Sequence, residues 1–83
     1  MKVEIGDLLI DDKAGERHDV IAVNPEYDGS PLEEVIIVTI ERESEERFEF
    51  TAEEVDAMES EGRMRKIAPG EPGYFWQEMI EIS

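Results

Sequence analysis

The sequence predicts a small α+β domain, mainly β, in which a strongly bent antiparallel sheet carries one short helix at about residues 52–61. The run 35–40 is β-branched throughout, which favours a strand at the centre of a sheet. Other short apolar runs alternate with turn residues, a pattern typical of further strands. Thr51 and Glu54 form a capping-box pattern, which predicts the start of the helix.

The length of the chain allows one hydrophobic core. With 83 residues, we expect a single domain over residues 1–83. Its core should span residues 3–68, followed by a Pro/Gly linker at 69–73 and an apolar segment at 74–83. Cysteine is absent, so packing or a partner must stabilise the fold without disulfides.

The remaining strands are predicted from their local patterns. Alternating apolar positions in residues 3–10 predict a short strand, a turn at Gly6-Asp7 and the entry of a second strand. Residues 24–33 contain two prolines and a glycine and should form a surface loop. A hairpin is expected at 43–45. Strands are also predicted at 18–23, 47–50 and 64–67.

The segment 74–83 holds half of the aromatic residues, namely Tyr74, Phe75 and Trp76. Its pattern fits a helical face or a strand, and its isoleucines favour the extended form. Aromatic and methionine side chains are favoured at interface cores, so the segment could dock on another chain and support a homo-oligomer. The favoured interpretation is that it folds back over a core that needs covering.

The opening of the chain carries a family resemblance. The stretch Ile5-Gly6-Asp7-Leu8-Leu9-Ile10, followed by Asp19-Val20-Ile21-Ala22-Val23, resembles the start of small SH3-like barrels. The order of the predicted elements resembles that family over residues 3–68, although the helix at 52–61 is longer than the single 3₁₀ turn usual there. The resemblance implies a binding or regulatory module more often than an enzyme, and it names no ligand.

Net charge is the most extreme property of the chain. The formal charge of −15 is distributed as −7 over residues 1–40, −8 over residues 41–61 and 0 over residues 62–83. A field of this sign repels phosphate backbones and anionic lipid, which argues against direct binding of nucleic acid or membranes. The small basic group Arg63, Arg65 and Lys66 is the exception.

The composition also resembles that of proteins from salt-in halophiles. Eight basic residues stand against 23 acidic ones, and only three of the bases are lysine. In molar salt the Debye length falls to about 3 Å, so repulsion among carboxylates is screened while their hydration keeps the protein dissolved. Acidity would then be an adaptation. Glu outnumbers Asp by 17 to six, whereas such surfaces are usually rich in both.

Two interpretations of the acidic block 41–61 stay open, and they concern Glu45, Glu46, Glu53 and Glu54 in particular. In the first, these residues imitate the charge of a nucleic acid backbone and occupy the basic groove of another protein. In the second, which we favour, they only solvate a hairpin and a helix face and discourage edge-to-edge aggregation of the strand at 35–40.

The sequence offers few candidates for chemistry. His18 is the only histidine, and a lone histidine in a strand is usually structural or simply exposed. Residues 24–29 match the front half of a calcium loop, but the back half is missing, which favours an ordinary surface loop. Asp7 with Asp11 and Asp12 could gather a cation, although paired surface acids usually only solvate a turn. We therefore expect no catalytic, cofactor or metal site.

These observations favour a non-enzymatic interaction or regulatory module with a protein partner. The alternative is an acidic inhibitor that imitates nucleic acid and blocks a DNA- or RNA-binding protein, and a small metal-dependent or hydrolytic enzyme comes third. No apolar run approaches the roughly 20 residues of a membrane span, and residues 1–4 lack the apolar region of a signal peptide. The expected location is the cytoplasm.

Overall fold

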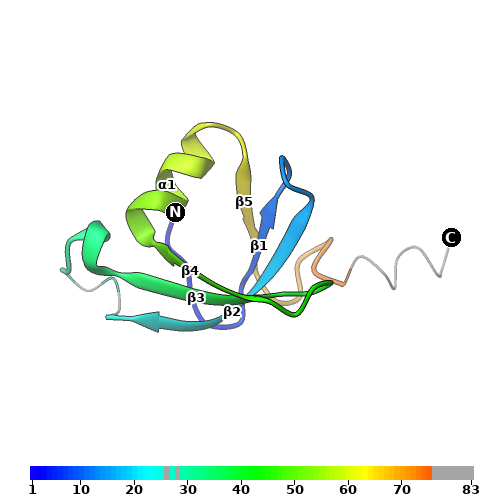
Figure 1. Cartoon of the computed structure of the whole chain (residues 1–83), viewed down its shortest axis with the longest axis horizontal. Coiled ribbons are helices and arrows are strands. Elements are labelled where there is room, and N and C mark those ends of the chain that lie inside the picture. Colours follow the sequence, from blue (N-terminus) through cyan, green and yellow to red (C-terminus); the bar gives the residue numbers. More distant parts are fainter. Residues whose placement is uncertain (26, 28, 76–83) are drawn as a thin grey trace, which may run out of the picture.

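A five-stranded antiparallel sheet forms the body of the molecule in the computed structural model, with the strand order β4-β3-β2-β1-β5 (Figure 1). The structure describes residues 1–25, 27 and 29–75. The elements along the chain are β1 (Leu8–Asp11), β2 (Glu16–Asn24), the 3₁₀ helix η1 (Leu32–Glu34), β3 (Ile36–Glu41), β4 (Arg47–Thr51), α1 (Ala52–Ser60) and β5 (Met64–Ile67).

The sheet is strongly bent and does not close. The nine-residue strand β2 pairs with β1 through its first half and with β3 along most of its length. A register shift between Val20 and Ala22 inserts an extra residue, which increases the local twist and bends the strand. The edge strands β4 and β5 do not pair with each other. The predicted fold class is confirmed as a bent, open sheet with one short helix.

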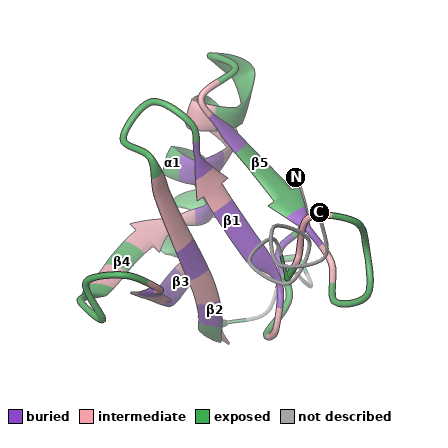
Figure 2. Cartoon of the chain, turned by 90° about the vertical axis from the view of Figure 1, so that its right-hand side faces the viewer, coloured by how far each residue is buried: buried purple, intermediate pink, exposed green. Residues whose placement is uncertain are grey.

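The core lies between the inner face of the sheet and α1. Helix α1 contributes Ala52 and Val55, and both are fully buried. Figure 2 shows buried stretches both on α1 and on the strands of the sheet. Ala52 and Val55 pack with Val3, Leu9, Val20, Val35, Ile37 and Met64 from the sheet and its connections. Because these side chains come from all parts of the chain, the core ties together the segments that carry the candidate site.

Helix α1 begins at the predicted residue and ends one residue before the predicted end, at Ser60. Thr51 Oγ1 accepts a hydrogen bond from the Glu54 NH at 3.0 Å, and the Glu54 carboxylate accepts one from the Thr51 NH at 2.8 Å. Gly62 follows the helix with φ of 74°, a left-handed conformation that glycine adopts without strain. With nine residues α1 is too short to cross a bilayer, and the described residues form no longer apolar helix.

The predicted strand before Gly6 is wrong. Val3 is buried, but residues 1–7 form no strand, because a tight turn takes the backbone out of the ladder. The Asp7 NH donates to the Glu4 carbonyl at 3.1 Å, and the Asp7 carboxylate accepts from the Glu4 NH at 2.8 Å. The other predicted strands are confirmed with small shifts at their ends, and the strand at 64–67 matches β5.

Candidate protein-interaction surface

The hairpin between β3 and β4 carries one of the two predicted acidic groups. Glu43, Glu45 and Glu46 are all exposed, and Glu45 has a left-handed backbone with φ of 61°. The Glu41 NH donates to the Glu46 carbonyl at 2.9 Å, and the Glu45 NH donates to the Glu41 carbonyl at 2.9 Å. The backbone of this turn is therefore fixed while its carboxylates remain in solvent.

A buried carboxylate that the sequence analysis did not single out organises this hairpin. Glu41 is 4 % exposed, and its oxygens accept backbone NH groups from Arg17 at 3.0 Å, Glu43 at 3.0 Å and Ser44 at 2.8 Å. Burial alone would raise the pKa of Glu41, but these hydrogen bonds lower the pKa to about 2. The sequence signal was an acidic residue just before a polar turn, where a carboxylate can accept backbone NH groups.

The second acidic group lies where α1 begins. Glu53 and Glu54 are exposed in its first turn, where negative charge is favourable against the helix dipole. The helix η1 packs against α1, and the Ala52 NH donates to the Val35 carbonyl at 2.8 Å. This contact brings the exposed side chains of η1 to the same end of the molecule. We call the four carboxylates of Glu33, Glu34, Glu53 and Glu54 the helix-end cluster.

The two acidic groups do not form one face. The hairpin group precedes β4, and Glu53 and Glu54 of the helix-end cluster follow it, so the length of β4 separates these residues. Five residues of strand at roughly 3.4 Å each correspond to about 17 Å. A partner that contacts Glu45 and Glu46 must therefore reach along β4 to contact Glu53 and Glu54.

Within the described residues, four arginines form ion pairs with carboxylates outside these two acidic groups. The ion pairs are Arg42 with Asp19 at 2.9 Å, Arg47 with Glu49 at 3.3 Å, Arg63 with Asp11 at 2.8 Å and Arg65 with Asp12 at 2.9 Å. Within the described part of the chain, no ion pair reaches the helix-end cluster or the exposed hairpin carboxylates of Glu43, Glu45 and Glu46. Their charge is available to an external cation.

Two of the three aspartates that could have gathered a cation, Asp7 and Asp11, have internal roles instead, whereas Asp12 is exposed and pairs with Arg65. Asp11 is buried and binds the Arg63 guanidinium, which lowers the pKa of Asp11, and the backbone NH groups of Lys13 and Ala14 add to this effect. Asp7 is also buried, so the expectation of solvated surface acids is wrong for both residues. Their hydrogen-bond partners explain why burial is tolerated. The described residues contain no group of three ligands suited to a metal.

His18 is fully buried in β2. Its Nδ1 lies 3.1 Å from Thr39 Oγ1, and its Nε2 lies 3.3 Å from a carboxylate oxygen of Glu16. The rings of Phe48 and Phe50 meet the imidazole edge-on, with centroids at 4.7 and 5.5 Å. The ring is thus enclosed by its partners and has a packing role.

The calcium-loop pattern at residues 24–29 falls partly outside the described residues, which omit positions 26 and 28. The preference for an ordinary surface loop there stays a prediction.

The aromatic segment begins by folding back on the domain. The Tyr74 hydroxyl donates to the Gly6 carbonyl, and Arg42 donates to the Tyr74 carbonyl at 2.7 Å while lying 5.1 Å from the centre of its ring. Phe75 is 55 % exposed and touches Tyr74 edge-on. Trp76 lies outside the described residues. The structure therefore attaches Tyr74 to its own chain and leaves Phe75 on the surface.

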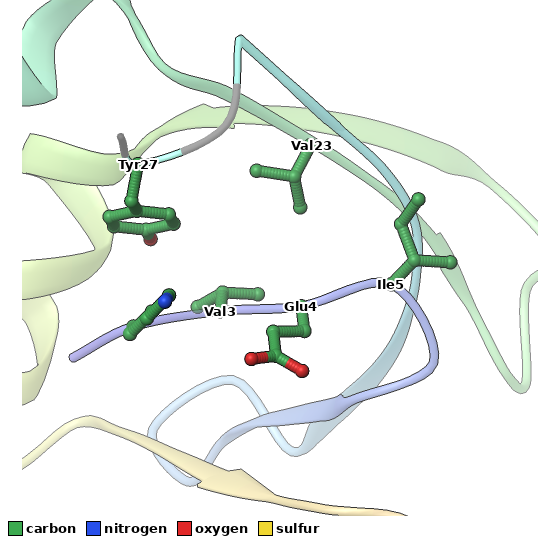
Figure 3. A pocket seen from close by; sticks show the side chains of 6 residues that line it. Val3, Glu4, Ile5, Val23 and Tyr27 are labelled. Atoms are coloured by element: carbon green, nitrogen blue, oxygen red, sulfur yellow. The ribbon is translucent and has the colours of Figure 1, made fainter. Parts of the chain in front are cut away.

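A pocket of about 360 Å³ opens between the N-terminal segment and the end of β2 (Figure 3). It is lined by Lys2, Val3, Glu4, Ile5, Val23 and Tyr27, and we call it the β2 groove. Ile5 is 67 % exposed, and Ile21, next to the groove on β2, is 48 % exposed. Large apolar side chains that gather on a surface in this way indicate an interaction site.

Tyr27 forms one wall of the groove beside α1 (Figure 3). Its hydroxyl is shielded from solvent and has no partner with hydrogen-bond geometry. Burial raises the pKa of Tyr27, the Val3 NH lowers it in part, and the charge of Asp56 raises it further. The groove was not predicted from the sequence. The available signal was a tyrosine inside a Pro/Gly loop together with an isoleucine directly before a turn glycine.

Comparison of the chain with protein-family models, curated proteins and solved structures gave no match. The function is therefore argued from the surface of the domain itself.

Proposed function

We propose that this domain is a non-enzymatic interaction module that binds a basic protein partner, with the helix-end cluster as its main charged contact. The observation that carries the proposal is the absence of an ion pair to these carboxylates among the described residues, while Arg42, Arg47, Arg63 and Arg65 are paired within the domain. An uncompensated acidic surface accelerates association with a positive partner and opposes negative ones.

The position of the helix-end cluster favours it over the hairpin carboxylates. The β2 groove ends at Tyr27, which lies beside α1 and is influenced by the charge of Asp56 on that helix. Charge alone attracts any cation, whereas an interface also needs an apolar centre that excludes water. The apolar wall at Tyr27 therefore lies beside the helix that carries Glu53 and Glu54.

The strand order supports a further part of the proposal, namely that the domain is an SH3-like module. A meander of β1, β2, β3 and β4 is followed by α1, and β5 returns to pair with β1. This arrangement agrees with the family resemblance of the opening strands. Small domains of that kind usually serve as binding modules, so the analogy favours binding over catalysis.

Neutralising equal charge at the two acidic groups tests the proposal. The helix-end variant is Glu33→Gln/Glu34→Gln/Glu53→Gln, and the hairpin variant is Glu43→Gln/Glu45→Gln/Glu46→Gln. The probe is a fluorescent heptapeptide in which lysine and valine alternate, titrated in dilute salt. Three exposed charge contacts at roughly 0.5 kcal/mol each predict about tenfold weaker binding for the helix-end variant. The hairpin variant should lose no more than about twofold.

Both variants have the same net charge, so they control for uniform attraction of a cationic peptide. Urea unfolding of each variant checks that the fold is kept, because every substituted side chain is exposed. Equal losses of affinity in the two variants, or no saturable binding to the unmodified domain, would contradict the proposed function.

A further inference from the structure

We propose that the partner binds as an added strand on the open edge of β2, with one of its apolar side chains in the β2 groove. This inference rests on the proposed function, since it takes the partner to be a basic protein segment. It adds the conformation of that segment and its point of contact.

Among the described residues, no strand pairs with the outer edge of β2 over its last four residues. Next to the N-terminal segment, the Gly6 NH donates to the Val20 carbonyl at 2.9 Å, and the Val20 NH donates to the Asp7 carbonyl at 2.9 Å. Beyond Val20, residues 22–24 pair with β3 on one side, and Ile21 is the extra residue at the register shift. No backbone hydrogen bond from the described N-terminal residues reaches residues 21–24 on the other side. Such an edge offers backbone groups to an extended segment.

The β2 groove lies directly against this open edge. Figure 3 shows the N-terminal segment diverging from β2, with Val3, Val23 and Tyr27 around the opening. The apolar side chains of Ile5 and Ile21 are exposed where the two segments separate. A strand placed here would bury them and would gain backbone hydrogen bonds from β2.

The chemistry of the occupant follows from the pleat of a strand and from the surrounding charge. Successive side chains of a strand point to opposite faces, so alternate residues of the partner face the groove and the solvent. The groove requires apolar side chains at the partner positions that face it. Lys2 and Glu4 are both exposed at the groove and their charges offset each other, so it is the helix-end cluster that favours lysine or arginine at the solvent-facing positions. The occupant is therefore an extended segment that alternates apolar and basic residues.

Two comparisons test this mode of binding. The first uses the lysine–valine heptapeptide against the same peptide N-methylated at alternate residues, which removes backbone donors without changing charge. Strand addition predicts at least tenfold weaker binding of the methylated peptide. The second compares Ile5→Ser with Phe75→Ser, which removes a similarly exposed apolar side chain from the aromatic segment. If the bound peptide buries part of the Ile5 side chain, the affinity of Ile5→Ser for the peptide should be about fivefold weaker. The affinity of Phe75→Ser should be unchanged, because Phe75 lies outside the proposed contact.

The outcomes separate this inference from the proposed function. Equal affinity of the methylated and unmethylated peptides would overturn strand addition, as would a loss confined to Phe75→Ser. If the helix-end variant still bound about tenfold more weakly in either case, the proposed function would stand without this mode of docking. Unfolding curves of both serine variants confirm that a loss of affinity does not come from loss of the fold.

Discussion

Replacing Glu41 with glutamine should lower the free energy of unfolding at neutral pH by about 2 to 3 kcal/mol. The carboxylate accepts three backbone NH groups in a buried position. In the Glu41→Gln variant, the amide NH₂ must face either the Arg17 NH or the turn NH groups, which places donor against donor. Urea unfolding followed by circular dichroism measures the change.

The pH dependence gives this prediction a second signature. The pKa of Glu41 is lowered from 4.5 to about 2, so its contribution to stability is fully present above pH 4.5 and is lost as the pH falls through 2. The difference in the free energy of unfolding between the native protein and Glu41→Gln should therefore shrink as the pH falls from 4.5 to about 2. Glu46→Gln, an exposed substitution in the same hairpin, is the control and should change stability by less than about 0.5 kcal/mol. Equal stability of the two variants at pH 7 would refute this role of Glu41.

The Asp11→Asn substitution should cost about 2 kcal/mol. Asp11 is 3 % exposed, and its two oxygens share a bifurcated hydrogen bond from Arg63 Nε at 3.1 Å, while Arg63 Nη2 donates a second one at 2.8 Å. The amide of an asparagine would present donors to this guanidinium. Because Arg63 lowers the pKa of Asp11, the stabilisation should be present above the usual aspartate pKa and should be lost as the pH falls through the lowered value.

The adjacent residue provides a matched control for this prediction. Asp12 pairs with Arg65 at 2.9 Å, but both side chains are about half exposed. An exposed pair of this kind contributes little, so Asp12→Asn should change stability by less than about 0.5 kcal/mol. Thermal or urea unfolding of the two variants measures both losses of stability. A similar loss for both would mean that the burial of Asp11 does not strengthen its pairing with Arg63.

Much of the fold could be predicted because local patterns and tertiary packing agree. The β-branched run at 35–40 became β3, and the Thr51 and Glu54 pattern became a complete capping box. The strand predicted before Gly6 failed because its outcome depended on side-chain hydrogen bonds of Asp7. Apolar periodicity contains no information about such a turn.

The candidate site was less predictable because tertiary contacts, and not local patterns, bring its residues together. The sequence gives the number of carboxylates, but it does not show that Glu33 and Glu34 of η1 lie beside the first turn of α1. The β2 groove also combines residues that are distant in the chain, such as Ile5 and Tyr27. Asp11 was misjudged because its arginine partner, Arg63, lies 52 positions away in the chain.

The location of a bound basic strand is the most direct test of the account. Amide chemical shifts of the isotope-labelled domain can be followed while the lysine–valine heptapeptide is added. We expect saturable shifts at residues 21–24, at Ile5 and in the first turn of α1, with little change at the hairpin. Shifts confined to Tyr74 and Phe75, or spread evenly over every exposed carboxylate, would contradict the account.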